Sequence, residues 1–199
     1  MSRQNFGFIE MTKQELRNQI KQIMSSNADS FQMFSSQICN LITEFSEYKK
    51  AKNILAYMPL NDEVDLKPVI KAALEEGKTV YLPKVDPLSP QMEFYKINAV
   101  HETSKGAFGI DEPEAGIPFN LHSNTETLVL VPGRSFTSKG ARLGRGKAYY
   151  DTYFSLLSHK VTMAGVCFGC QLVQELPVEK HDITMNWIIT ENGIIDCNS

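Results

Sequence analysis

The chain has 199 residues and a mass of 22.4 kDa, which is enough for one large domain or two small ones, and we expect one. Hydrophobic residues make up 42% and charged residues 22%, a composition that excludes a disordered, collagen-like or coiled-coil chain. The net charge of -3 disfavours a general nucleic-acid binder. No apolar run reaches the roughly 18 residues of a membrane span, and the first residues lack a signal-peptide core, so we expect a cytoplasmic protein.

The first element predicted along the chain is a helix that begins after Thr12. Residues 1–11 carry little pattern and are expected to form a loose N-terminal arm. Thr12 followed by Glu15 fits a capping box, in which each side chain accepts a bond from an otherwise unpaired backbone N–H. The apolar face of this helix is expected to consist of Leu16, Ile20 and Ile23. A basic stripe runs beside that face at Lys13, Arg17 and Lys21.

Apolar spacing predicts a second helix and then a series of strands. The second helix has one apolar face formed by Phe31, Phe34, Ile38, Leu41 and Phe45. Short apolar runs predict strands over 54–58, 79–82, 92–97, 127–131, 161–168 and 187–190. Pro59 and Pro83 are expected to end the first two strands. Helices are predicted over 66–76, closed by Gly77, and over 147–158, with a loop over 106–118.

Continuously apolar strands separated by helices indicate a mostly parallel, open sheet with helices on both faces. We therefore predict one three-layer, Rossmann-like α/β domain over residues 1–199. Ligands bind at the carboxyl ends of strands in such sheets. That rule points to three loops, which are residues 59–65, residues 132–147 and the stretch after residue 168.

The four cysteines are too few and too scattered for a disulfide scaffold. Cys39 falls beside the apolar face of the second helix, and Cys167 ends an apolar strand, so both are expected in the core. Cys167 and Cys170 form a Cys-x-x-Cys pair, but neither a second pair nor histidines at ligand spacing complete a zinc site. We therefore assign these thiols no redox or metal role.

The segment after the fourth predicted strand carries the strongest chemical signal. The segment contains no acidic residue between its first and last cation. The cations are Arg134, Lys139, Arg142, Arg145 and Lys147. The nearby glycines allow a ligand to approach the backbone, and they are Gly140, Gly144 and Gly146. Cations and backbone donors before a helix favour a phosphate-binding loop. The spacing nevertheless fits neither the Walker nor the dinucleotide motif, and a solvated basic turn that binds nothing is the alternative.

Residues 142–151 resemble the signature of the 5-formyltetrahydrofolate cyclo-ligase family, also called methenyltetrahydrofolate synthetases. They read Arg-Leu-Gly-Arg-Gly-Lys-Ala-Tyr-Tyr-Asp, where the family has Arg-Leu-Gly-x-Gly-x-Gly-Tyr-Tyr-Asp. Further ordered matches to family elements are at residues 13–17, 62–65, 108–113, 171–172, 176–177 and 181–182. The departures from the family pattern are Ala148 in place of Gly, Arg134 in place of a small or apolar residue, and Asn186 in place of Asp.

The resemblance implies an enzyme that uses ATP and Mg²⁺ to convert 5-formyltetrahydrofolate into 5,10-methenyltetrahydrofolate, ADP and phosphate. It implies a monomer whose partners are a reduced folate and ATP, with no nucleic acid and no membrane. The ATP site would consist of Lys13, Arg17, Arg142, Leu143, Gly144, Arg145, Gly146, Lys147, Ala148, Tyr149 and Tyr150. The folate site would consist of Met58, Glu63, Arg145, Gly146, Lys147, Ala148 and Tyr149. Arg145 and Lys147 would be catalytic, and Asp151 and Asp182 would hold the metal.

Each assignment also has a structural alternative. Lys13 and Arg17 can form a solvated helix face, Asp151 can favour the first turn of a helix, and Glu63 can begin one. Two alternatives exist for the whole protein. One is a folate- or nucleotide-binding paralogue with low or altered activity, which the departures from the family pattern motivate. The other is a nucleic-acid-binding module, which the acidic net charge disfavours.

Overall fold

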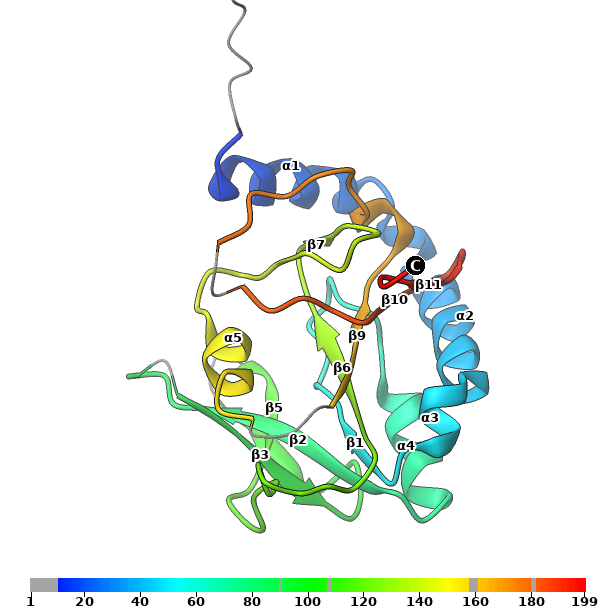
Figure 1. The fold of residues 1–199 in the computed structure, drawn as a ribbon, viewed down its shortest axis with the longest axis vertical. Helices are drawn as coiled ribbons and strands as arrows, with labels where there is room; N and C mark the ends of the chain where they lie inside the picture. The colour runs from blue at the N-terminus through cyan, green and yellow to red at the C-terminus, as the bar shows by residue number, and fades with distance from the viewer. Residues whose placement is uncertain (1–10, 90, 107–108, 158–160, 180–181) are drawn as a thin grey trace, which may run out of the picture.

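The computed structural model describes residues 11–199 apart from 90, 107–108, 158–160 and 180–181 (Figure 1). The expected N-terminal arm over 1–11 lies outside the described residues except for Met11. Phe108 and His181, which belong to two of the matched family elements, also lie outside them. In the part of the chain that is described, no helix is both long enough and apolar enough to cross a membrane.

A seven-stranded sheet forms the centre of the fold, with strand order β11-β10-β9-β6-β1-β2-β3. These strands are β1 (Asn53–Leu55), β2 (Thr79–Val85), β3 (Met92–Ile97), β6 (Thr127–Pro132), β9 (Thr162–Val166), β10 (Trp187–Thr190) and β11 (Gly193–Asp196). All neighbours from β10 to β2 pair in parallel, while β3 and β11 add antiparallel edges. The predicted mostly parallel sheet is confirmed, and β11 is an addition that the sequence did not indicate.

Helices cover both faces of the sheet, as predicted. The helices are α1 (Lys13–Ser25), α2 (Phe31–Glu44), α3 (Ser46–Lys50), α4 (Lys67–Glu75) and α5 (Tyr149–Phe154), with short 3₁₀ turns η1 (Ala28–Ser30) and η3 (Gly169–Gln171). Figure 1 shows α2, α3 and α4 on one side of the sheet and α5 on the other. In β6, Leu128 and Leu130 join the core under α2 and α4, while Val129 and Val131 join the core under α5. A strand that is buried on both faces must be apolar at every position, which explains its unbroken apolar sequence.

The start of α1 matches the prediction, but its buried face differs at one position. The Thr12 hydroxyl accepts a bond from the Glu15 N–H at 3.2 Å, and the Glu15 carboxylate accepts one from the Thr12 N–H at 2.8 Å. The capping box is therefore confirmed. Ile23 was expected in the apolar face, but it is 37% exposed and Met24 is buried instead. Met24 continues the four-residue spacing of the two buried residues before it, so it stays on the helix face that packs into the core.

Strand β2 continues through Pro83 to Val85, so the prediction that this proline ends the strand was wrong. The Tyr81 carbonyl accepts a bond from the Ala56 N–H at 3.0 Å, which shows that Tyr81 faces β1. Pro83, two residues later, faces the same side. Because β1 has already ended at Leu55, no ladder hydrogen bond is lost where the proline lacks its N–H.

The elements around the predicted ligand loops are shorter than expected. The helix predicted over 147–158 is reduced to α5, whose preceding residue Ala148 has a left-handed backbone with φ 55° and ψ 13°. A right-handed helix cannot include that residue, and the expected end at residue 158 lies outside the described residues. The expected loop over 106–118 contains strand β5 (Asp111–Pro113), which pairs with β4 (Thr103–Lys105). A second small hairpin joins β7 (Ser135–Phe136) and β8 (Arg142–Leu143).

Candidate functional site

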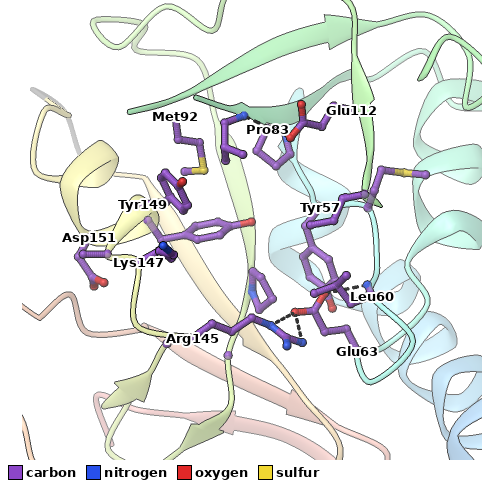
Figure 2. Close-up of a pocket in the computed structure, with 18 of the residues that line it drawn as sticks. Tyr57, Leu60, Glu63, Pro83, Met92, Glu112, Arg145, Lys147, Tyr149 and Asp151 are labelled. Atoms are coloured by element: carbon purple, nitrogen blue, oxygen red, sulfur yellow. Dashed lines mark hydrogen bonds and ion pairs between the residues drawn. The ribbon is translucent and has the colours of Figure 1, made fainter. Parts of the chain in front are cut away.

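Two of the three predicted loops, residues 59–65 and 132–147, meet at one pocket with a volume of about 400 Å³ (Figure 2). Most of the predicted site residues line it, namely Met58, Glu63, Arg142, Gly144, Arg145, Lys147, Ala148, Tyr149, Tyr150 and Asp151. The stretch after residue 168 does not line the pocket. Its Gln171 side chain instead donates bonds to the backbone carbonyls of Gly133 and Arg134 at 2.9 and 3.1 Å, and so supports the second loop from behind.

An ion network joins the two loops across the mouth of the pocket. The Arg145 guanidinium contacts Glu63 Oε1 at 2.8 Å through Nη2 and at 3.0 Å through Nε. Asp62 forms ion pairs with both Arg145 and Arg134. Burial alone would raise the pKa of Asp62, but the two arginines outweigh it and hold that pKa below its ordinary value. Burial likewise opposes the charge on Arg145, and the Glu63 and Asp62 carboxylates reverse the effect and raise its pKa.

Glu63 is held in place by a tight turn of the first loop. The Glu63 N–H donates to the Leu60 carbonyl at 3.0 Å, and Glu63 Oε2 accepts a bond from the Leu60 N–H at 3.0 Å. The Tyr57 hydroxyl donates to the Val64 carbonyl at 3.2 Å, which ties the two ends of the loop together. The structural alternative for Glu63, that it begins the following helix, is wrong because α4 begins at Lys67.

Arg142 and Asp151 form a second ion pair deeper in the site. Arg142 Nη2 contacts Asp151 Oδ2 at 2.7 Å, with only 5% of the arginine side chain exposed. The guanidinium also lies over the Tyr150 ring, 5.6 Å from its centroid. Arg142 Nε is buried without a hydrogen-bond partner among the described residues. Asp151 also lies in the first turn of α5, so its structural alternative is compatible with its position in the pocket.

The basic stripe of α1 reaches the same region, although its residues do not line the pocket. Lys13 Nζ contacts Asp182 Oδ2 at 2.9 Å and Glu179 Oε1 at 2.8 Å. Burial would lower the pKa of Lys13, but these two carboxylates outweigh it and raise that pKa. Arg17 Nε donates to the Gly144 carbonyl at 2.9 Å. These contacts exclude a purely solvated face for Lys13 and Arg17.

The remaining predicted residues differ in how they are held. Lys147 is exposed and forms no ion pair or hydrogen bond within the described part of the chain, so its ammonium group is available to a ligand. The Tyr149 hydroxyl donates to the Asp86 carbonyl at 3.2 Å, which fixes that ring at the pocket wall. Leu143 is buried in the core and can contribute to a ligand site only through its backbone. Gly146 has a φ of 99°, a conformation that favours glycine.

The carboxylates of Asp151 and Asp182 fit the chemistry of a magnesium site. Asp151 Oδ1 lies 3.4 Å from the backbone nitrogen of Ile183, so Asp182 is in the segment directly against Asp151. Across the described residues, no cluster of three or more metal-ligating side chains occurs. Mg²⁺ commonly uses one or two carboxylates and completes its shell with substrate phosphates and water, so two neighbouring acids near the cationic loop are a donor set that suits it.

The cysteines and Asn186 are explained by packing and hydrogen bonding. Cys39 and Cys167 are buried as predicted, and burial raises the pKa of both thiols, which disfavours the reactive thiolate. Asn186, which stands where the family pattern has Asp, accepts a bond at Oδ1 from the Met163 N–H at 2.8 Å. An aspartate would offer the same acceptor oxygen, so this departure preserves the contact.

Sequence reasoning missed one wall of the pocket. That wall comes from β2 and from the segment around β5, and its residues include Pro83, Val85, Ile110 and Glu112. No local pattern marks these positions, since β5 falls in the segment that was expected to be a loop. The match at residues 108–113 to a family element was the one signal that could have drawn attention to it.

The fold and the site define an α/β protein with a cation-rich pocket at the carboxyl ends of parallel strands. A sequence model of the 5-formyltetrahydrofolate cyclo-ligase family matches residues 9–191, so the chain belongs to this family. The chain is 27% identical to the 5-formyltetrahydrofolate cyclo-ligase of Mus musculus, over 93% of this chain and 96% of the mouse protein. It is 28% identical to the Saccharomyces cerevisiae protein of that name, over 92% of this chain and 97% of the yeast protein.

A solved structure supports the same assignment. The NMR structure of Aquifex aeolicus 5,10-methenyltetrahydrofolate synthetase superposes on this chain with a TM-score of 0.81 and 30% sequence identity. The alignment covers 95% of this chain and 94% of the Aquifex chain. The likeness therefore extends over nearly all of the α/β domain.

Proposed function

We propose that this protein uses ATP and Mg²⁺ to convert 5-formyltetrahydrofolate into 5,10-methenyltetrahydrofolate, with release of ADP and phosphate. One observation carries the proposal. The cationic loop expected to bind phosphates and the Met58–Glu63 turn expected to bind folate line a single pocket. A reaction that joins a nucleotide phosphate to a folate oxygen requires both ligands in one site, and family membership supports the same chemistry.

The chemistry explains the charges around the pocket. The formyl oxygen attacks the γ-phosphorus of ATP, the bond to ADP breaks, and a phosphorylated formyl group results. N10 of the folate then attacks the formyl carbon, its proton is released, and the carbon–oxygen bond breaks as phosphate leaves. Both steps depend on cations that position and stabilise phosphoryl oxygens. Lys147, which has no protein partner among the described residues, and Arg145, at the pocket mouth, supply those charges.

The other residues bind and orient the two substrates. Arg17 contacts the Gly144 carbonyl of the cationic loop, and Lys13, one helical turn before it, pairs with Asp182; both would bind phosphates of the nucleotide. Asp151 and Asp182 would hold Mg²⁺, which neutralises phosphate charge when bound. The buried Met58 and the fixed Tyr149 ring offer apolar surface to the folate. We propose that the protein acts as a monomer and that the reaction takes place in the cytoplasm.

The test is the absorbance rise of methenyltetrahydrofolate when protein is mixed with 5-formyltetrahydrofolate and Mg-ATP, with an ATP-free control. We expect an ATP-dependent rise, and we expect Lys147→Ala to lower turnover by about three orders of magnitude, as loss of a transition-state cation can. Lys139→Ala is the matched control, because Lys139 is an exposed cation of the same segment that does not line the pocket. Folate and ATP binding without product would favour the binding paralogue instead.

A further inference from the structure

Glu112 is an unusual carboxylate because it is buried in the pocket wall without a compensating charge. Glu112 is only 4% exposed, and it is the one charged residue among the buried residues that the structure describes. Its single hydrogen bond is a long one, from the Val85 N–H to Oε1 at 3.5 Å. No cation of the described residues forms an ion pair with it. Burying a carboxylate in this way is costly, so a purely structural role does not account for it.

The carboxylate of Glu112 lies against Gly106 in the wall of the pocket. Gly106 packs so closely behind it that a Cβ at that position would lie 2.2 Å from Glu112 Oε2. The Lys84 ammonium donates to the Pro113 carbonyl at 3.2 Å, which anchors the end of β5 to β2. In Figure 2, Glu112 lies at the Pro83 side of the pocket, across it from Arg145. Glu112 lines the pocket, and the donors of the described residues leave most of its acceptor capacity unused.

Glu63, a carboxylate on the Arg145 side of the pocket, has less acceptor capacity to spare. Its Oε1 accepts bonds from Arg145, and its Oε2 accepts one from the Leu60 N–H. A reduced pterin ring carries several N–H donors, including an amino group beside a ring N–H. A pair of adjacent donors matches the two oxygens of a carboxylate. Of these two glutamates, Glu63 is already occupied by protein donors, and Glu112 accepts only one long bond from the described residues.

We propose that Glu112 is a specificity-determining residue that accepts hydrogen bonds from the N–H donors of the reduced pterin ring. This inference rests on the proposed function, since it takes the substrate to be a reduced folate. Glu112 fixes the pterin at the end of the pocket away from Arg145. The formyl group then faces the cationic loop that carries the phosphate chemistry.

The test compares ligand affinity in Glu112→Gln and in the wild type. The glutamine keeps an oxygen for the Val85 N–H but presents an NH₂ group where a ligand donor needs an acceptor. We expect the dissociation constant for 5-formyltetrahydrofolate to rise about ten- to a hundredfold, while that for ATP stays within about twofold. A pterin fragment, 5-formyl-6-methyltetrahydropterin, should lose affinity by the same factor. Glu114→Gln, an exposed acid of the same segment, is the control and should bind as the wild type does.

A second variant separates binding from folding. Glu112→Leu removes a buried charge that has one long hydrogen bond, so its melting temperature should equal or exceed that of the wild type while folate binding is lost. Wild-type affinity for folate in Glu112→Gln would overturn the inference, and so would a loss confined to the full-length folate with the pterin fragment unaffected. If the wild type itself did not bind 5-formyltetrahydrofolate, the proposed function would fail, and the inference with it.

Discussion

Ala148 carries backbone strain that a glycine would relieve. It is the only described non-glycine residue with a positive φ, at 55°, and the family signature has glycine at this position. A left-handed conformation costs an L residue about 1–2 kcal/mol. Glycine adopts it freely but gives the unfolded chain extra freedom worth about 0.4–1 kcal/mol. Ala148→Gly should therefore stabilise the protein by about 1 kcal/mol and raise its melting temperature by about 2–4 °C.

Ala115→Gly provides the matched control. Ala115 is an exposed loop residue whose φ is not positive, so glycine relieves no strain there and should cost about 0.4–1 kcal/mol through the unfolded chain alone. Urea and thermal unfolding of both variants measure the difference. If the two substitutions shift stability equally and in the same direction, the strain argument is wrong.

The same variant also tests whether Ala148 limits activity. The backbone at this position already has the conformation that favours glycine, so the loop before α5 needs no rearrangement to accept a glycine. We expect Ala148→Gly to change turnover by less than about twofold, because only interactions altered in the transition state change the rate. A tenfold gain in turnover would instead favour the low-activity paralogue and would make the methyl group its cause.

Two further pairs of variants test the loop geometry and the basic stripe. Gly140 has a φ of 84°, and a Cβ there would lie 2.3 Å from the Met185 carbonyl oxygen, whereas Gly77 has a φ of 75° with open space around it. Chemical denaturation should show Gly140→Ala destabilised by about 3 kcal/mol or more and Gly77→Ala by only about 1 kcal/mol, and equal losses would exclude the steric clash as the cause. Lys13→Ala should raise the KM for ATP about tenfold with the KM for folate unchanged, because it removes the charge-assisted contact to phosphate that we propose for Lys13. Lys21→Ala, at an exposed position of the same stripe, should leave both KM values unchanged. Steady-state kinetics of the two variants measures the difference.

The layers of the fold were predictable because the signals that specify them are local. The capping box at Thr12 and the unbroken apolar run of β6 each depend on a few consecutive residues. Pro83 and Ile23 were misread for the opposite reason. Whether a proline interrupts a sheet depends on where the neighbouring strand ends, and which residue of a helix is buried depends on the angle at which that helix packs.

Part of the candidate site was likewise predictable from local sequence, and part was not. The cations Arg142, Arg145 and Lys147 fall within six residues of one recognisable signature, and all three line the pocket. The contacts from Asp62 to Arg134 and Arg145 link residues 72 and 83 positions apart, and Glu112 enters the pocket from a third segment. No spacing rule within one segment predicts such contacts. They depend on the parallel order of the strands, which brings the ends of distant segments together.

Among the residues that depart from the family pattern, Arg134 has the most directly measurable consequence. It forms an ion pair with Asp62, which also pairs with Arg145. The pKa of Asp62 in the folded protein lies below its ordinary value of 3.8, so this carboxylate stabilises the fold above that pH. The stabilisation is lost as the pH falls through the lowered pKa. Arg134→Leu removes one of the two cations, so the pKa of Asp62 should move up toward its ordinary value, and the stability that Asp62 contributes above that pH and loses in acid should become smaller.

A double-mutant cycle with Asp62→Asn isolates this effect from any other change at position 134. The free energy of unfolding is measured between about pH 3 and pH 7 for the wild type, both single variants and the double variant. An asparagine does not titrate, so Arg134→Leu should leave the pH dependence unchanged in that background. An equal shift in both backgrounds would mean that Arg134 acts through another group. A change in pH dependence that occurs only when Asp62 is present would establish that Arg134 holds Asp62 in its charged form. Asp62 is one of the two carboxylates that position Arg145.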